Sequence, residues 1–336
     1  MGQFFMDMGQ FVLQAAVIVV SLVLLISFIA SLVAKDREAH TLTVKNLNKK
    51  YKAQAQSLHR SFLHKKQLKS LLKKEKKEQK AEPNERPTLF VLDFDGDIKA
   101  SATEHLREEI STLLMVAKPT DQVLIRLESP GGMVHGYGLA ASQLQRIKDK
   151  GIPLVACVDK IAASGGYMMA SVADKVISAP FAIIGSIGVI ASVPNFNKLL
   201  KKNDIDYLEI TAGEYKRTLT PLGEITEPGM KKFKEQIEQV HILFKEHVKN
   251  QRPSVDLDKV ATGEYWYGLQ SKDLGLVDEI GTSDDFIIDH LNTHRILSLA
   301  YRGKKSFKDK LAESLSLQIE TVLTKVLSFS WRSVFQ

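Results

Sequence analysis

Residues 122–149 read QVLIRLESPGGMVHGYGLAASQLQRIKD, and this stretch decides the fold class. Its first seven residues have the β-branched, apolar character of a buried strand, SPGG at 129–132 is a turn, and the remainder has the spacing of an amphipathic helix. Similar apolar strands recur at 88–94, 153–159 and 175–180. Strands that alternate with helices indicate βαβ units around a largely parallel, buried sheet.

The flanking segments extend this pattern. An amphipathic helix is expected at 103–116, a helical run over 227–250, a second one around 255–273, and a strand at 275–280. No internal repeat of solenoid length is present. We therefore predict one α/β domain over residues 87–300.

The composition excludes several classes of protein. Of the 336 residues, 44% are hydrophobic and 25% charged, which is typical of a globular protein and rules out wholesale disorder, a collagen-like fibre and a disulfide scaffold. A single cysteine, Cys157, excludes an intrachain disulfide and any structural zinc site with two thiolates from this chain. Because Cys157 lies in an apolar strand, we expect it to be buried.

The excess positive charge lies in one segment. Residues 35–80 contain 15 basic and 4 acidic side chains, whereas the 256 residues after them contain 31 basic and 34 acidic ones. The body of the protein is therefore not basic, and binding of nucleic acid is not expected.

The N-terminal region predicts a membrane anchor. Residues 11–34 carry no charge and one polar amide, Gln14, over a length that spans a bilayer as a helix. A cleaved signal peptide is the alternative, but the run is too long, no basic residue precedes it, and Leu32 occupies the −3 position of a cut after Ala34.

Residues 35–86 predict a Lys-rich helical stalk. This segment has no Gly or Pro before Pro83, and it reads either as a solvated spacer or as a contact with anionic membrane lipids. The positive-inside rule favours a cytoplasmic location for it.

The C-terminal residues 304–336 predict an amphipathic helix, because apolar side chains recur there at steps of three and four. This helix could pack on its own domain, on a neighbouring subunit or on the membrane surface.

Three glycine-bearing turns follow apolar strands. In the first, the amides of Gly131 and Gly132 suit an oxyanion hole, although an ordinary strand-to-helix turn has the same sequence. The second, AASGGY at 162–167, places Ser164 before a helix, as a nucleophile or as a simple N-cap. The third, GSIGV at 185–189, contains Ser186.

A serine nucleophile requires a base, and none of the nine histidines has an obvious supporting motif. Lys216, in AGEYKR at 212–217, can serve if its amine is neutral, which burial favours. The alternative is an ordinary surface lysine.

Taken in order, SPGG, ASGGY, GSIGV and GxYK, with Lys216 following Ser164 by 52 positions, resemble the signal peptide peptidase A family. Members are membrane-anchored serine–lysine peptidases with a ClpP/crotonase-like fold. The anchor, the Lys-rich stalk and the stretches 127–145 and 178–189 resemble its SohB branch more closely, and the match runs to about Thr282.

The resemblance implies a role for six residues: Ser164 as nucleophile, Lys216 as general base, Ser186 as the residue that orients Lys216, and backbone amides of Gly131 or Gly132 and of Gly165 as oxyanion donors. Glu128 stands where the family often has Asn, which puts any role of that Asn side chain in doubt. No metal or organic cofactor is implied.

The resemblance also implies the setting of the reaction. Substrates would be membrane-associated or unfolded peptides, and the enzyme a ring-like homo-oligomer in the inner membrane with sites completed near subunit interfaces. Better-known family members face the periplasm, in conflict with the charge rule.

Three other functions compete with peptide hydrolysis. Asp93 and Asp95 imitate the nucleophile strand of magnesium-dependent haloacid-dehalogenase-like phosphatases. A crotonase-type acyl-CoA enzyme would share the fold, and a catalytically idle membrane scaffold would share the anchor. His290 and His294 have metal-compatible spacing, but no motif marks a third ligand.

Overall fold

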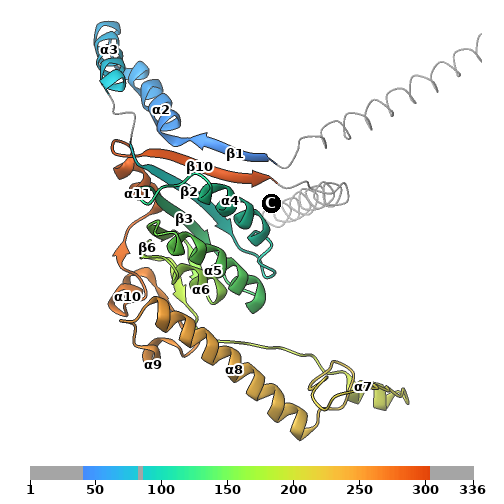
Figure 1. The fold of residues 1–336 in the computed structure, drawn as a ribbon. Coiled ribbons are helices and arrows are strands. Elements are labelled where there is room, and N and C mark those ends of the chain that lie inside the picture. The colour runs from blue at the N-terminus through green and yellow to red at the C-terminus, as the bar shows by residue number, and fades with distance from the viewer. Residues whose placement is uncertain (1–40, 82–85, 303–336) are drawn as a thin grey trace, which may run out of the picture. The chain divides into compact units, whose positions relative to one another are not determined.

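The computed structural model describes residues 41–81 and 86–302, and residues 43–300 form one compact body within them (Figure 1). The predicted anchor at 11–34 and the C-terminal helix at 304–336 lie outside the described residues. Within the described ranges, no helix is both long and apolar enough to cross a membrane.

A seven-stranded sheet organises the body, in the order β1-β10-β2-β3-β4-β6-β9. Each neighbouring pair from β10 to β9 is parallel, which confirms the mostly parallel sheet. Four of its strands coincide with the predicted apolar runs. The strand predicted at 275–280 is shorter than expected, because only its last two residues form β9. The strands are β1 (Thr41–Asn46), β2 (Thr88–Asp95), β3 (Gln122–Glu128), β4 (Leu154–Val158), β6 (Lys175–Ser178), β9 (Glu279–Ile280) and β10 (Arg295–Arg302).

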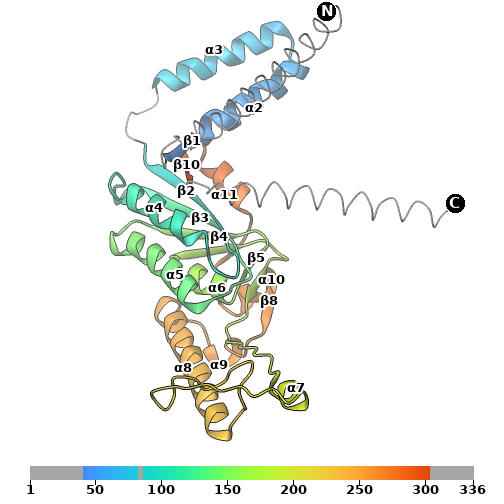
Figure 2. The same ribbon diagram turned by 90° about the vertical axis from the view of Figure 1, so that its right-hand side faces the viewer.

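Helices cover both faces of this sheet. On one face α4 (Thr103–Leu114), α5 (Val134–Asp149) and α6 (Gly165–Ala170) lie side by side (Figure 2). On the other, α11 (Ser283–His290) inserts Ile287 into a cluster with strand residues such as Leu124 and Val155. Apolar side chains on both faces explain why these strands read as continuous hydrophobic runs.

The start of the predicted stalk belongs to the packed body. Residues 41–46 form β1 at the edge of the sheet, and α2 (Leu47–Phe62) begins with Leu47, which is buried in the same cluster as Leu124. The second stalk helix is α3 (Lys65–Ala81). The folded part of the chain therefore begins well before residue 87.

A second sheet of three short strands was not predicted. It contains β5 (Ile161–Ala163), β7 (Ile183–Gly185) and β8 (Tyr265–Tyr267), with β7 in the centre. The helix predicted around 255–273 is instead interrupted, as α9 (Leu257–Val260), β8 and α10 (Gly268–Asp273). Helix α9 ends at Val260, Gly263 follows with φ +87°, which is not helical, and three consecutive aromatic residues then favour a strand.

Residues 188–226, here called the arm, leave the second sheet and return to the start of α8 (Glu227–Gln251) (Figure 1). The arm contains α7 (Asn197–Lys202) and closes on itself, because the side-chain amide of Asn195 donates to the carbonyl oxygens of Thr220 (3.0 Å) and Gly223 (2.8 Å).

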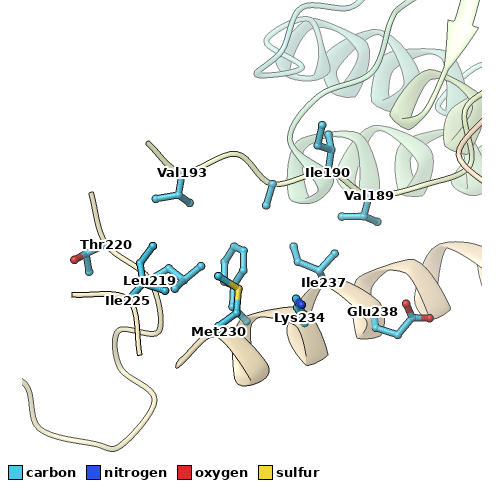
Figure 3. Close-up of a pocket in the computed structure, with 12 residues that line it drawn as sticks. Val189, Ile190, Val193, Leu219, Thr220, Ile225, Met230, Lys234, Ile237 and Glu238 are labelled. Carbon is cyan, nitrogen blue, oxygen red and sulfur yellow. The ribbon is translucent and has the colours of Figure 1, made fainter. Parts of the chain in front are cut away.

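Between the arm and α8 lies an apolar cavity of about 610 Å³ (Figure 3). Val189 and Val193 face Met230 and Ile237 of α8 across it. Much of the apolar surface of the arm is exposed, including Ile190, Leu208 and Ile210, each more than 80% exposed. The body thus covers little of this surface.

Candidate active site

Ser164 occupies the turn between β5 and α6, in a backbone conformation that favours glycine (φ +53°, ψ −119°). Its N–H donates to the carbonyl oxygen of Gly185 (2.7 Å), and its own carbonyl accepts from Met168 (2.9 Å). The Ser164 side chain makes no capping hydrogen bond to α6. The hydroxyl is therefore not used as an N-cap, and on this half-buried serine it forms no hydrogen bond to any residue that the structure describes.

Gly131 lies directly against Ser164. It has φ +89°, and a Cβ there would lie 2.7 Å from the Ser164 Cβ and 2.8 Å from the Gly165 nitrogen. No larger residue fits this place without displacing the Ser164 turn. The glycine turn after β3 and the serine turn after β5, separate in sequence, therefore form one site, and a parallel bridge between Ser129 and Ala162 joins the two segments.

The three predicted oxyanion donors differ in what they already bind. The N–H of Gly131 donates to the Ser129 hydroxyl oxygen (3.1 Å). Among the described residues, the N–H groups of Gly132 and Gly165 have no hydrogen-bond acceptor. Two of the three amides are therefore free to bind a ligand oxygen.

Ser186 is adjacent to the same site. It follows Gly185, the residue that accepts the Ser164 N–H, and has φ +52°. Its own N–H donates to the carbonyl oxygen of Glu264 (2.7 Å), which ties the end of β7 to β8. The geometry brings Ser164, Ser186 and the glycines together, on backbone conformations that are costly for serine.

Lys216 lies apart from them. It is exposed on the arm, and in the described part of the chain its side chain forms no hydrogen bond or ion pair. The adjacent Tyr215 ring lies 5.2 Å from the ammonium of Lys232, near the start of α8. Lys216 therefore lies beside the N-terminal end of that helix.

The Ser164 turn lies near the C-terminal end of α8. There His247 lies 2.9 Å from the carbonyl oxygen of Met168 in α6, and burial lowers the pKa of His247, so the neutral ring donates this bond. The 15 residues from Lys232 to His247 span about 22 Å of helix, more than a lysine side chain can bridge. One chain in this conformation does not bring Lys216 to Ser164.

The other candidate groups are engaged elsewhere. Both carboxylate oxygens of Asp93 accept from the guanidinium of Arg126 (2.6 and 2.9 Å), so Asp93 is not a free nucleophile. His290 donates from Nδ1 to the carbonyl oxygen of Phe286 (2.6 Å). Over residues 41–81 and 86–302, no three His, Cys, Asp or Glu side chains are grouped to hold a metal ion.

Sequence comparison identifies relatives over most of the chain. The model for "Peptidase family S49 N-terminal" matches residues 3–144, and that for "Peptidase family S49" matches residues 146–295. The chain is 48% identical over 322 residues to a probable protease SohB of Haemophilus influenzae, covering 90% of each. A probable protease SohB of Buchnera aphidicola is 52% identical over 246 residues, 73% of each chain. This chain belongs to peptidase family S49.

Each of the two S49 matches contains some of the turns of the site. The N-terminal one contains Gly131 and Gly132, and the second contains Ser164, Ser186 and Lys216. A solved structure of a mutant 1510-N membrane-bound stomatin-specific protease with a substrate peptide covers 68% of this chain and 98% of its own, at 15% identity and a TM-score of 0.42.

Two interactions in this S49 peptidase were missed by sequence reasoning. Lys160 donates to both carboxylate oxygens of Glu128 (2.9 Å each), linking the residues just before the two turns. Ser129 and Tyr137 form a buried hydrogen-bonded pair behind Gly131. The only sequence signal was the position of Ser129 inside SPGG, because Tyr137 lies on a helix whose orientation depends on packing.

Proposed function

We propose that the chain is a membrane-anchored serine endopeptidase that uses Ser164 as nucleophile and Lys216 as general base. The observation that carries the proposal is the Ser164 hydroxyl, which makes no capping hydrogen bond to α6 and belongs to a residue with a glycine-like backbone conformation. Beside it lie the N–H groups of Gly132 and Gly165, which have no acceptor among the described residues. Strained residues of this kind persist where the surrounding structure over-determines them, as at active sites.

The reaction follows from these groups. The Ser164 Oγ attacks the carbonyl carbon of a peptide bond while the neutral Lys216 amine takes its proton. The carbonyl oxygen gains the negative charge and accepts hydrogen bonds from the two amides, each worth about 2.7–4 kcal/mol in comparable hydrolases. Lys216 then protonates the leaving amine, and water cleaves the acyl-enzyme with the same base.

The distance between the two groups places a condition on this mechanism. Since one chain holds Lys216 near the start of α8 and Ser164 near its end, we propose that the arm of a second copy supplies Lys216. The exposed apolar side chains of the arm support such an assembly, because monomeric proteins rarely expose large contiguous apolar patches. The interface would also supply the burial that a neutral lysine requires.

Two inactive variants test both proposals. Ser164→Ala and Lys216→Ala should each abolish hydrolysis of a soluble peptide, and a serine-reactive fluorophosphonate should label the wild type but not Ser164→Ala. Mixing the two variants during reassembly should restore about a quarter of the wild-type rate, because one site in four pairs an intact serine with an intact lysine.

The outcomes separate the proposals from their alternatives. Substantial hydrolysis by Ser164→Ala would overturn the serine mechanism, and an unlabelled wild type without peptidase activity would favour an idle scaffold. Turnover of an acyl-CoA thioester in place of peptides would favour the crotonase-type reaction. Inactive mixtures of folded, assembled variants would overturn the supply of Lys216 by a second copy.

We further propose a single-pass inner-membrane location through residues 11–34 and substrates that are membrane-associated or unfolded peptides. The basic segment at 35–80 argues for a cytoplasmic body, and the resemblance to periplasmic peptidases argues for the other side. A reporter enzyme fused after Gln336, active on one side of the membrane only, decides between them.

A further inference from the structure

A chain of three hydrogen bonds runs behind the SPGG turn. The Gly131 N–H donates to the Ser129 Oγ (3.1 Å), Ser129 Oγ lies 2.6 Å from the Tyr137 hydroxyl, and Tyr137 donates to the carbonyl oxygen of Asp97 (2.7 Å). Because the Tyr137 hydroxyl has one proton and gives it to Asp97, Ser129 must donate its own proton to Tyr137. All three bonds therefore point the same way, from the turn towards Asp97.

The two hydroxyl-bearing residues of the chain are buried. Ser129 and Tyr137 are both 0% exposed, and a Cβ at Gly96 would lie 2.5 Å from each of their hydroxyl oxygens. Burial raises the pKa of Tyr137, so the phenol keeps its proton at neutral pH. Buried, fully paired hydroxyls of this kind hold their partners in one arrangement.

The same two residues also contact the serine turn. The backbone of Ser129 makes two hydrogen bonds to β5. Its N–H donates to the Ile161 carbonyl oxygen (2.8 Å), and its carbonyl oxygen accepts from the Ala163 N–H (3.0 Å). The Tyr137 side chain lies so close to Gly165 that a Cβ there would approach the Tyr137 Cβ to 2.8 Å. Ser129 and Tyr137 therefore touch both turns that carry the free amides.

These contacts lie next to both free amides. The hydrogen bond to Ser129 holds the N–H of Gly131, the residue just before the Gly132 N–H, and the Tyr137 ring packs against Gly165 itself. We propose that Ser129 and Tyr137 are positioning residues for peptide hydrolysis, which hold the Gly132 and Gly165 amides in the geometry that binds the oxyanion. The inference rests on the proposed serine mechanism.

The proposal predicts a specific kinetic signature. The oxyanion forms in the transition state and not in the bound substrate, so misplaced donors lower kcat and leave KM unchanged. Replacing a residue with a purely structural role would instead lower the amount of folded enzyme, without a selective loss of kcat at constant KM.

The test uses two variants of the full-length chain in detergent and a soluble peptide substrate. Tyr137→Phe keeps the ring against Gly165 and removes the hydroxyl, and should lower kcat about tenfold. Ser129→Ala removes two of the three bonds and should lower kcat about 100-fold, within the loss seen when an oxyanion donor is deleted. A peptide aldehyde, which forms a tetrahedral adduct with the serine, should lose affinity by the same factors.

Tyr167→Phe is the matched control. Tyr167 is also 0% exposed, and its hydroxyl donates one buried hydrogen bond, to the carbonyl oxygen of Leu276 (2.9 Å). Its loss should lower the melting temperature about as much as Tyr137→Phe does while leaving kcat unchanged. Circular dichroism confirms that each variant is folded, and Ser129→Ala decides alone if Tyr137→Phe does not fold.

Wild-type kcat in folded Tyr137→Phe and Ser129→Ala, or losses matched by Tyr167→Phe, would overturn the inference. So would an increase in KM at constant kcat. Ser164→Ala, measured in parallel, distinguishes failure of the serine mechanism from failure of the positioning roles. If Ser164→Ala remains active, the serine mechanism itself fails, whereas an inactive Ser164→Ala beside a fully active Tyr137→Phe removes only the positioning roles.

Discussion

The N–H of Ser164 donates a 2.7 Å hydrogen bond to the carbonyl oxygen of Gly185. This bond joins the turn after β5 to the end of β7, and it holds Ser164 at φ +53°. A serine in this region of backbone space costs about 1–3 kcal/mol relative to a relaxed conformation. The fold therefore maintains a strained residue at the proposed nucleophile, and this strain can be measured.

Replacement of Ser164 by Gly and by Ala should separate strain from chemistry. Both variants lack the hydroxyl and should be inactive, but Ser164→Gly should have a free energy of unfolding about 1 kcal/mol higher than Ser164→Ala, because glycine accepts a positive φ. Urea unfolding measures the difference.

At the exposed Ser142 in the middle of α5, the order should be reversed, since Gly in a helix is about 1 kcal/mol less stable than Ala. Equal stability of the two Ser164 variants would show that the turn carries no strain.

Gly131→Ala should inactivate the enzyme. The added methyl group would lie 2.7 Å from the Ser164 Cβ, and φ +89° is unfavourable for alanine, so the turn must move and kcat should fall about 100-fold or more. Gly151→Ala is the control, because Gly151 also has a positive φ (+69°) but no atom within 4 Å of the added Cβ. It should lose stability and keep kcat. Equal kcat values for the two variants would contradict the contact between Gly131 and Ser164.

The Arg252–Asp278 pair should make stability depend on pH. Burial alone would raise the pKa of Asp278, but the Arg252 guanidinium (2.7 and 2.8 Å) and the Val176 N–H (2.7 Å) lower it below its ordinary value. A carboxyl group with a lowered pKa stabilises the fold above its unfolded pKa, about 3.9, and this contribution is lost as the pH falls through the folded pKa.

Asp278→Asn leaves the largely buried Arg252 without its charged partner and should lower the free energy of unfolding at pH 7 by about 2 kcal/mol. Its unfolding free energy should also change less than that of the wild type below pH 4. Glu235→Gln, at the exposed pair with Lys232, should cost less than about 0.5 kcal/mol. Parallel pH dependences of wild type and Asp278→Asn, measured by urea unfolding, would contradict the role of Asp278.

Cys157 should react with thiol reagents only when the chain unfolds. The side chain is 1% exposed on β4, and burial raises the pKa of the thiol to about 12, so almost no thiolate is present at neutral pH. Labelling by a disulfide reagent should therefore follow the unfolding curve in urea, with Cys157→Ser as the blank. Rapid labelling in the absence of urea would show that β4 is accessible in the folded state.

The sequence by itself determined four central strands of the sheet and the turns of the site. Continuous apolar runs such as 88–94 and 122–128 have no stable place outside a covered sheet, and the glycines after them are needed wherever two backbones approach closely. These signals are local, because they depend on the residues within one strand and its turn. Ser164 could be named as the nucleophile candidate without a structure because four such motifs, taken in order, resemble a known family.

Only the tertiary structure decided how these pieces are used. Whether the Ser164 hydroxyl caps α6, and whether the Gly131 amide is already bound, depends on Gly185 and Ser129, which lie on other strands. The distance between Ser164 and Lys216 depends on the length and direction of α8. Hydrogen-bond partners and separations of this kind are set by packing between segments far apart in the chain, and no local pattern of residues encodes them.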